Sequence, residues 1–524
     1  MTRVLVFDTT LRDGAQGPGV SFSLQDKLDI VARFDEMGFD YIEGGYAVSN
    51  PKEMEFFREV KKLQLAKIKV VAFGNTRRVG TSAEDDPSLR GILDAETPVA
   101  CVVGKTWDLH VDVVLKTTLD ENLAMIADSV RLLKNAGREV IFDAEHYFDG
   151  YHANASYAIQ CLEAARDAGA DVLCLCDTNG GSFPSWIEEV AAATHGKIAA
   201  ALGIHCHNDG DMATANTIAA VEAGAVMVQG TVNGLGERCG NADLCTVIPG
   251  LMLKLGREVI APENLKRLTE LSLYVYELAN MIPRDGQPYV GVNAFSHKAG
   301  LHVDAIQKMR RTYEHIEPES VGNERRFLIS ELSGRSSILA KAHAEELHTR
   351  PDLVKKVVKR VQELENAGYQ FEAAEASFDL LVRKLVGRHR KFFDLDRFNV
   401  VVDRFKDGSP VTVATVKLTV KGKVQHTASE GDGPVNALDG ALRKALENFY
   451  PVIRDVHLID YKVRVVNPHA GTAAKVRVVI ESRDHDSVWS TVGVSENLID
   501  ASWQALVDSV EYKLLKEEAR KGKS

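Results

Sequence analysis

Eight short apolar runs, each followed by a longer stretch of helical period, divide the first half of this 524-residue chain. Runs rich in Val, Ile and Phe that alternate with helical patterns are typical of repeated β-α units with a parallel sheet. The runs are Val4–Phe7, Tyr41–Glu43, Lys69–Phe73, Val99–Val103, Glu139–Phe142, Val172–Leu175, Leu202–His205 and Val226–Gln229. Eight units in about 250 residues is the size of a closed (β/α)8 barrel. No Gly-x-Gly-x-x-Gly turn of a doubly wound sheet follows the first run, so we predict a TIM barrel over residues 1–275.

The remaining residues change character twice. Residues 276–395 are predicted to be mostly helical linker subdomains, with amphipathic stretches at Leu353–Glu365 and Ala373–Val386. Residues 396–524 are predicted to form an α+β domain, because two strand patterns, a glycine turn at Gly431–Pro434 and a helical pattern occur there and then recur. The two helical patterns are Val435–Glu447 and Asn497–Tyr512. This order indicates an internal duplication of strand-strand-helix units, which suits either a regulatory ligand site or a plain dimerisation module.

Composition narrows the class of function. The formal net charge of -11 is not gathered into long blocks, which argues against nucleic acid or an anionic membrane as the main partner. The chain opens with a strand pattern and contains no apolar run of membrane-spanning length, so we expect a cytoplasmic protein. Seven cysteines without a Cys-x-x-Cys pair indicate neither a disulfide framework nor a thiolate zinc site. A small-molecule function is favoured.

Unusual polar residues follow several of the predicted strands. Arg12 and Asp13 come after the first run, Glu145 after the fifth and Thr178 after the sixth. His205 and His207 lie at the end of the seventh run, and Asn241 follows the eighth. Because the active site of a (β/α)8 barrel lies at the C-terminal ends of its strands, we expect these side chains to meet there.

His205 and His207 are two residues apart, so both imidazoles should point to the same face of their strand. With Asp13 they would form a three-ligand divalent-metal site with open coordination positions, and Asn241 could add an amide oxygen. Such ligands also suit non-haem iron oxygenases, but those usually occur on a jelly roll, so the barrel favours Lewis-acid chemistry. Arg12 would stabilise charge on a carbonyl oxygen, and Thr178 could donate to a substrate carboxylate.

Three motifs resemble one family. They are Asp8–Gly14, His205–Asp209 and Gly234–Asn241, and they are similar to the motifs of the metal-dependent acyl-CoA Claisen enzymes that include 2-isopropylmalate, homocitrate and citramalate synthases. The longer strings Ala72–Arg78, Gly104–Asp108 and Asp143–Gly150 look most like the citramalate synthases. The turn at Gly431–Val435 resembles that of the regulatory domain in this family, so the resemblance covers essentially the whole chain.

The resemblance implies an acyltransferase that condenses acetyl-CoA with pyruvate and water to give (R)-citramalate and CoA, in isoleucine biosynthesis through 2-oxobutanoate. The alternative is 2-isopropylmalate synthesis, with 2-oxoisovalerate as acceptor in leucine biosynthesis. It further implies a Mn²⁺, Mg²⁺, Co²⁺ or Zn²⁺ ion, a homodimer and an amino-acid effector, with isoleucine expected and leucine possible. Three other interpretations are disfavoured. A lyase of the same superfamily would lack the duplicated domain, and a biotin-dependent carboxyltransferase would use a lysine ligand at the metal. A non-catalytic sensor would not need all of the polar residues Arg12, Asp13, Glu145, His205, His207 and His302.

Five further residues receive roles through the resemblance. His302 is the expected base, assisted by Glu145 and by Tyr313. Because His302 lies beyond the barrel in the sequence, we expect it to reach a catalytic site across the dimer interface. Phe73 and Tyr147 are expected to narrow the acceptor pocket.

Overall fold

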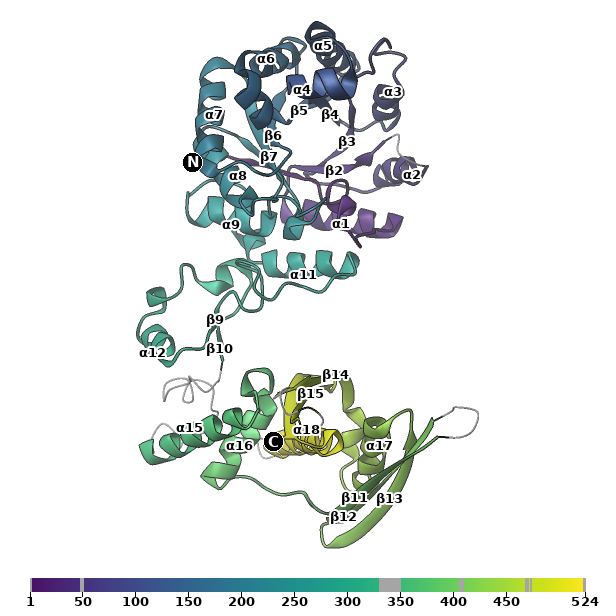
Figure 1. The fold of residues 1–524 in the computed structure, drawn as a ribbon, viewed down its shortest axis with the longest axis vertical. Helices are drawn as coiled ribbons and strands as arrows, with labels where there is room; N and C mark the ends of the chain where they lie inside the picture. Colours follow the sequence, from purple (N-terminus) through teal and green to yellow (C-terminus); the bar gives the residue numbers. More distant parts are fainter. Residues whose placement is uncertain are drawn as a thin grey trace. The chain divides into compact units, whose positions relative to one another are not determined.

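The computed structural model describes residues 2–47, 51–328, 350–404, 410–466, 471 and 474–521. The chain divides into two compact units (Figure 1). The first comprises Met1–Phe295 with Ile316–Arg325, and the second comprises Ser296–His315 with Arg326–Ser524.

The first unit contains a closed eight-stranded parallel barrel, in which β1 pairs with both β2 and β8. The strands are β1 (Leu5–Asp8), β2 (Tyr41–Tyr46), β3 (Lys69–Asn75), β4 (Val99–Lys105), β5 (Glu139–Glu145), β6 (Val172–Asp177), β7 (Ala201–Cys206) and β8 (Met227–Gly230). Each of the eight predicted runs overlaps one of these strands, and the first and last runs begin one residue before theirs. The predicted TIM barrel is therefore confirmed.

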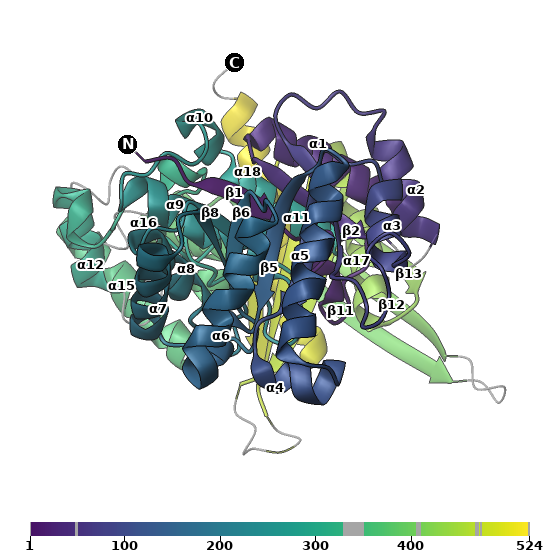
Figure 2. The same cartoon turned by 90° about the horizontal axis from the view of Figure 1, so that it is seen from above.

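Helices cover the outside of the strand ring (Figure 2). They are α1 (Leu24–Met37), α2 (Pro51–Val60), α3 (Pro87–Asp94), α4 (Asp108–His110), α5 (Leu119–Asn135), α6 (Tyr147–Asp167), α7 (Pro184–Lys197), α8 (Ala213–Glu222), α9 (Leu244–Leu253), α10 (Pro262–Leu265) and α11 (Leu268–Leu278). Outward strand residues such as Ile42 and Val102 join the helices in one large core, whereas inward residues such as Phe7 and Met227 form a second cluster inside the barrel. This division follows from the alternation of side chains along a strand.

In the second unit, the segment predicted as mostly helical also contains a short parallel pair, β9 (Ser296–His297) with β10 (Arg326–Phe327). Among its described residues, this segment contains the helices α12 (Gly300–Lys308), α15 (Pro351–Asn366) and α16 (Glu375–Val386). The two predicted amphipathic stretches lie on α15 and α16. Phe378 of α16 packs in one apolar cluster with Val492 and Val494, so α16 lies against the C-terminal sheet.

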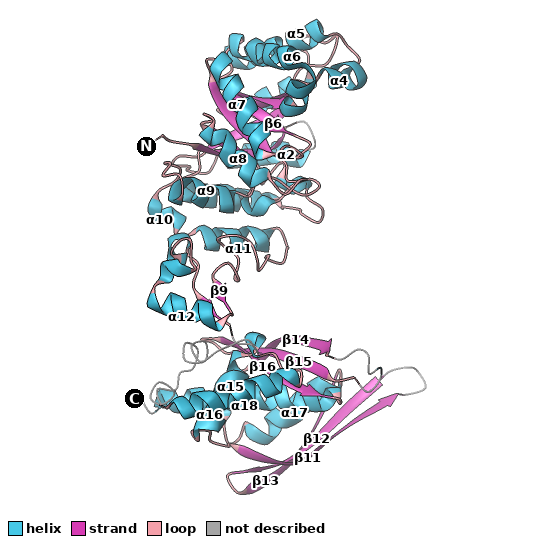
Figure 3. Ribbon diagram, turned by 60° about the vertical axis from the view of Figure 1, so that its left-hand side comes forward, coloured by secondary structure: helices cyan, strands magenta, loops and turns pink. Residues whose placement is uncertain are grey.

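The C-terminal residues form two three-stranded antiparallel sheets, each followed by a helix (Figure 3). The first repeat is β11 (Phe393–Arg404), β12 (Pro410–Val420), β13 (Lys423–Gly431) and α17 (Pro434–Leu446). The second is β14 (His457–Val465), β15 (Val476–Arg483), β16 (Val488–Ser495) and α18 (Leu498–Lys521). The duplication is present, but each repeat has one strand more than predicted. The added strands β11 and β14 are sheet edges with mostly exposed side chains. Tyr461, Val463 and Val465 do alternate with Lys462 and Arg464 along β14, so the sequence held a usable signal for that strand.

Within the described residues, no helix is both long enough and apolar enough to span a bilayer.

Candidate metal centre

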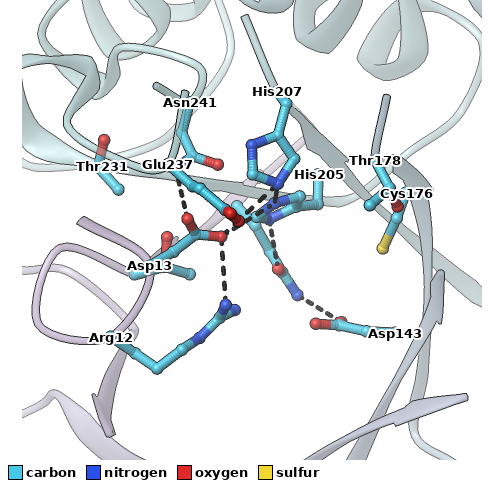
Figure 4. A network of polar contacts seen from close by, with 12 residues as sticks. Arg12, Asp13, Asp143, Cys176, Thr178, His205, His207, Thr231, Glu237 and Asn241 are labelled. Atoms are coloured by element: carbon cyan, nitrogen blue, oxygen red, sulfur yellow. Dashed lines mark hydrogen bonds and ion pairs between the residues drawn. The ribbon is translucent and has the colours of Figure 1, made fainter. Parts of the chain in front are cut away.

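Three ligand-type side chains converge at the C-terminal end of the barrel (Figure 4). Asp13 follows β1, and His205 and His207 lie at the end of β7. Asp13 Oδ2 lies 3.5 Å from His205 Nε2 and 3.8 Å from His207 Nε2, and the two Nε2 atoms are 3.5 Å apart. All three residues are buried. Barrel closure brings them together because β1 is hydrogen-bonded to β8, which is itself paired with β7.

The protonation states suit a metal ion better than an ion pair. Burial lowers the pKa of His205 to about 3 and also lowers the pKa of His207, so both imidazoles are neutral near pH 7 and keep a lone pair. Burial acts to raise the pKa of Asp13, but the Arg12 guanidinium and the histidines outweigh it and hold that pKa at about 2. One carboxylate and two neutral imidazoles form a donor set that divalent metals accept.

Asn241 supplies a fourth polar group. Its Nδ2 donates to Asp13 Oδ1 at 3.1 Å and to the Leu235 carbonyl at 3.0 Å. Its buried Oδ1 has no hydrogen-bond partner among the described residues. A buried acceptor without a donor is costly, and a metal ion or its bound water would satisfy it. The residues present therefore fit a divalent metal.

The glycine-rich loop after β8 determines where Asn241 lies. The backbone of Asn241 forms an isolated β-bridge with His207, and the Asn241 N–H donates to the Gly234 carbonyl at 3.2 Å. Gly236 has a φ of 152°, and a Cβ placed there would lie 2.1 Å from Asn241 Nδ2. Only glycine leaves room for the amide against Asp13. Glu237 of the same loop points toward the two imidazoles in Figure 4 and was missed by the sequence analysis, although it lies inside a motif quoted there.

Arg12 is fixed beside the three ligands. Its Nε donates to Glu43 Oε2 at 2.6 Å and its Nη1 donates to Asp13 Oδ2 at 3.2 Å. Its guanidinium carbon lies 4.0 Å from the centroid of the Phe73 ring, close enough for a cation-π contact. Phe73 therefore positions Arg12. Glu43 is fully buried, and burial raises its pKa to about 7.

Thr178 and Glu145 lie at the same barrel rim. The Thr178 hydroxyl accepts a hydrogen bond from the His146 backbone N–H at 2.9 Å, so its own proton is available to another acceptor. Glu145 ends β5 and forms an ion pair with Lys105, which ends the neighbouring β4. Lys105 was not predicted, although its place at a strand end was a usable signal.

Tyr147 does not lie where the sequence analysis placed it. Its side chain is fully buried at the start of α6, and its hydroxyl lies 2.7 Å from Thr194 Oγ1 of α7. The ring belongs to the core between the barrel and the helices, with Phe148 at 5.8 Å. The expectation that it narrows the acceptor pocket is therefore wrong, because its neighbour Glu145 ends the strand and the chain turns outward into a helix.

His302 and Tyr313 belong to the second unit. Their rings stack with centroids 4.0 Å apart and an interplanar angle of 25°. His302 lies on α12, and about half of the Tyr313 side-chain surface is exposed. The structure therefore brings the two predicted residues of this unit together.

Three family models match consecutive parts of the chain. Residues 3–275 match the HMGL-like family, residues 289–368 the homocitrate synthase post-HMGL domain-like family, and residues 372–514 the LeuA allosteric (dimerisation) domain. An (R)-citramalate synthase from Geobacter sulfurreducens is 52% identical over 100% of this chain and 99% of its own length. Another from Aquifex aeolicus is 52% identical over 98% of each chain. The chain belongs to the (R)-citramalate synthase family.

A probable 2-isopropylmalate synthase from Methanopyrus kandleri is only 32% identical over 97% of this chain and 98% of its own length. The family resemblance carried by the motifs is therefore confirmed. The comparisons support the citramalate synthase family and do not support the alternative, a 2-isopropylmalate synthase.

Proposed function

We propose that this transferase condenses acetyl-CoA with pyruvate and water to give (R)-citramalate and CoA, as a step toward isoleucine through 2-oxobutanoate. The observation that carries the proposal is the 52% identity to an (R)-citramalate synthase over the full chain. The convergence of Asp13, His205 and His207 supports it independently.

We assign Asp13, His205 and His207 to holding a divalent metal ion, with Asn241 adding the amide oxygen that has no hydrogen-bond partner in the described part of the chain. Mn²⁺, Mg²⁺, Co²⁺ and Zn²⁺ all accept such ligands. The bound ion would supply Lewis acidity to the keto group of pyruvate. The neutral imidazoles keep their lone pairs for this purpose, because burial lowers the pKa values of both.

Arg12 and Thr178 are assigned to the acceptor substrate. The Arg12 guanidinium is held by Glu43, Asp13 and the Phe73 ring, so its charge needs no reorganisation when an oxyanion develops. The Thr178 hydroxyl can donate to the pyruvate carboxylate while it accepts from His146. Phe73 remains beside this group and is proposed to limit the space for the acceptor.

The donor substrate requires a base. His302 would take a proton from the methyl group of acetyl-CoA, and the resulting carbanion would form a carbon-carbon bond with the keto carbon of pyruvate as the carbonyl π bond opens. The former keto oxygen would then take up a proton and become the hydroxyl group of the product. Water would then hydrolyse the thioester, which releases CoA and leaves (R)-citramalate. Tyr313 stacks on His302 and would orient its ring, while Glu145 would assist proton transfer from the barrel rim.

A steady-state assay of CoA release tests this function. Pyruvate, 2-oxobutanoate and 2-oxoisovalerate are each supplied with acetyl-CoA and Mn²⁺, and pyruvate is expected to give the highest kcat/KM. The margin over 2-oxobutanoate should be modest, because one methylene is worth about 1–3 kcal/mol. A preference for 2-oxoisovalerate would reject the proposed acceptor, and no CoA release with any acceptor would reject the enzyme activity.

We further propose a homodimer in which His302 acts on the partner's barrel, as the match to the LeuA allosteric (dimerisation) domain supports. His302→Ala and Arg12→Ala variants, each inactive alone, should regain CoA release when mixed and allowed to exchange subunits. Failure to recover activity after confirmed subunit exchange would refute action across the interface.

The regulatory proposal concerns a cavity of about 660 Å³ in the C-terminal domain. It is lined by α17 residues, including Asp439 and Arg443, and by apolar residues that include Ile453 and Leu458. Arg443 Nε donates to Asp439 Oδ2 at 2.7 Å, whereas the buried Asp439 Oδ1 has no partner among the described residues. A free carboxylate oxygen beside apolar walls suits the ammonium group and side chain of isoleucine.

We expect isoleucine to inhibit the full-length enzyme through this cavity, with leucine weaker. Asp439→Asn should raise the inhibition constant about tenfold or more, because a hydrogen bond to a charged group is worth about 1.5–3 kcal/mol. Asp486→Asn is the matched control, since this exposed carboxylate lies in the loop after β15. Equal inhibition of both variants would exclude the cavity as the effector site.

A further inference from the structure

The second ring nitrogen of His205 has a defined partner inside the barrel. His205 Nδ1 lies 3.0 Å from Gln229 Oε1, and Gln229 Nε2 donates to Asp143 Oδ1 at 2.8 Å. The first pair meets because His205 on β7 and Gln229 on β8 are register neighbours. The second crosses the barrel interior from β8 to Asp143 on β5, which Figure 4 shows beside the site.

The donor and acceptor roles along these contacts follow one order. The Sγ atoms of Cys101 and Cys174 lie within 4.8 Å of an Asp143 carboxylate oxygen, and burial raises the pKa values of both thiols, which keeps them protonated. Burial raises the pKa of Asp143, whereas the Gln229 amide and the Arg12 guanidinium oppose that rise, and Asp143 Oδ1 is the acceptor of the Gln229 hydrogen bond. The Gln229 NH₂ group must face this carboxyl, which turns the amide oxygen toward His205.

An acceptor facing His205 Nδ1 selects one tautomer of the imidazole. Nδ1 must carry the proton, so Nε2 must carry the lone pair. Nε2 is the atom that lies 3.5 Å from Asp13 Oδ2. The opposite tautomer would place an N–H where a metal ion requires a lone pair and would set two acceptors against each other at 3.0 Å.

The environment leaves Gln229 little freedom to reorient. Gln229 is fully buried, and Asp143 and His205 are 3% and 5% exposed. Water therefore cannot easily replace either contact. The His207 ring contrasts with this arrangement, because its buried Nδ1 has no hydrogen-bond partner among the described residues.

We propose that Gln229 is a positioning residue that, anchored by Asp143, fixes His205 in the Nδ1–H tautomer and so prepares Nε2 to bind a divalent metal ion. The inference rests on the proposed metal-dependent function. It assigns to the barrel interior a role in metal affinity. Outer-sphere partners of metal-bound histidines typically change metal affinity by about 10- to 100-fold when removed.

The test compares Gln229→Leu with Met227→Leu in the full-length protein. Met227 lies two residues earlier on β8 and is fully buried in the barrel interior, so the control probes packing on the same strand and face. Mn²⁺ affinity is measured by calorimetry, and folding is checked by circular dichroism. We expect Gln229→Leu to bind Mn²⁺ about 10- to 100-fold more weakly and Met227→Leu to stay within about threefold of the unchanged protein.

A second measurement does not depend on the stability of Gln229→Leu. Nitrogen-15 NMR of histidine side chains in the unchanged metal-free protein should find His205 protonated at Nδ1, with His205→Asn used to assign its signal. Protonation at Nε2, or equal Mn²⁺ affinity of folded Gln229→Leu and unchanged protein, would overturn the inference. If the unchanged protein itself binds no Mn²⁺, the proposed function fails instead, so the two failures are distinguishable.

Discussion

Gly236→Ala tests the geometry of the metal centre through one added methyl group. The alanine Cβ would lie 2.1 Å from Asn241 Nδ2 and 3.3 Å from Asp13 Oδ1. The first distance is far inside van der Waals contact, so the Asn241 side chain must move. Its displacement would break the hydrogen bonds to Asp13 Oδ1 and to the Leu235 carbonyl and would withdraw Oδ1 from the site.

The free-energy cost of Gly236→Ala has two parts. A residue other than glycine at a φ of 152° costs about 1–3 kcal/mol in backbone strain. The two lost hydrogen bonds add about 0.5–1.5 kcal/mol each. The strain lowers stability, whereas the displaced amide also weakens metal binding. We expect Mn²⁺ affinity to fall about tenfold or more, which corresponds to about 1.4 kcal/mol or more.

Mn²⁺ affinity by calorimetry and stability by thermal unfolding separate the two parts. Gly137→Ala is the matched control, because Gly137 has a φ of 76° with no atom within 4 Å of an added Cβ, and it precedes β5 at the opposite end of the strands. The control should lower stability without weakening metal binding. The reasoning is refuted if Gly236→Ala binds Mn²⁺ as tightly as Gly137→Ala does.

Three further outcomes follow from single contacts. Arg12→Lys should lower kcat for CoA release about 100-fold or more. The reason is that an ammonium group cannot hydrogen-bond to Glu43 and Asp13 and also stack on the Phe73 ring. An unchanged kcat would contradict the role of the guanidinium. Ser23→Ala should destabilise the barrel by about 1 kcal/mol, since Ser23 forms a capping box with Asp26 at the start of α1. Urea denaturation would measure this loss of stability, and the Mn²⁺ affinity should stay unchanged. Burial acts to raise the pKa of Asp484, but Lys513 and the backbone N–H groups of Asp486 and Ser487 outweigh it and hold that pKa below its usual range. The carboxylate therefore stabilises the C-terminal domain above about pH 4, and this contribution is lost as the pH falls further. Asp484→Asn should lower stability at pH 7 and reduce its loss in acid, as denaturation at pH 7 and at lower pH would reveal; an unchanged pH dependence would contradict this assignment.

Local patterns in the sequence were enough to identify the barrel and its strands. Each strand can be recognised from its own apolar residues and from the helical pattern that follows it, and both are local properties of the chain. The edge strands β11 and β14 were not predicted, although Tyr461, Val463 and Val465 alternate with Lys462 and Arg464 along β14 and so offered a local signal.

The spacing of His205 and His207 and the position of Asp13 after the first strand were also legible in the sequence. Which other side chains meet them was decided only by closure of the barrel. Closure brings Asp13 to 3.5 Å from His205 and carries Gln229 across the interior to Asp143. Tyr147 was misplaced because the direction of a side chain just beyond a strand depends on how the following helix packs. Local patterns therefore predict the strands and the types of ligand. The partners of those ligands depend on the folded barrel, because the contacts join distant strands whose relative register no local pattern encodes.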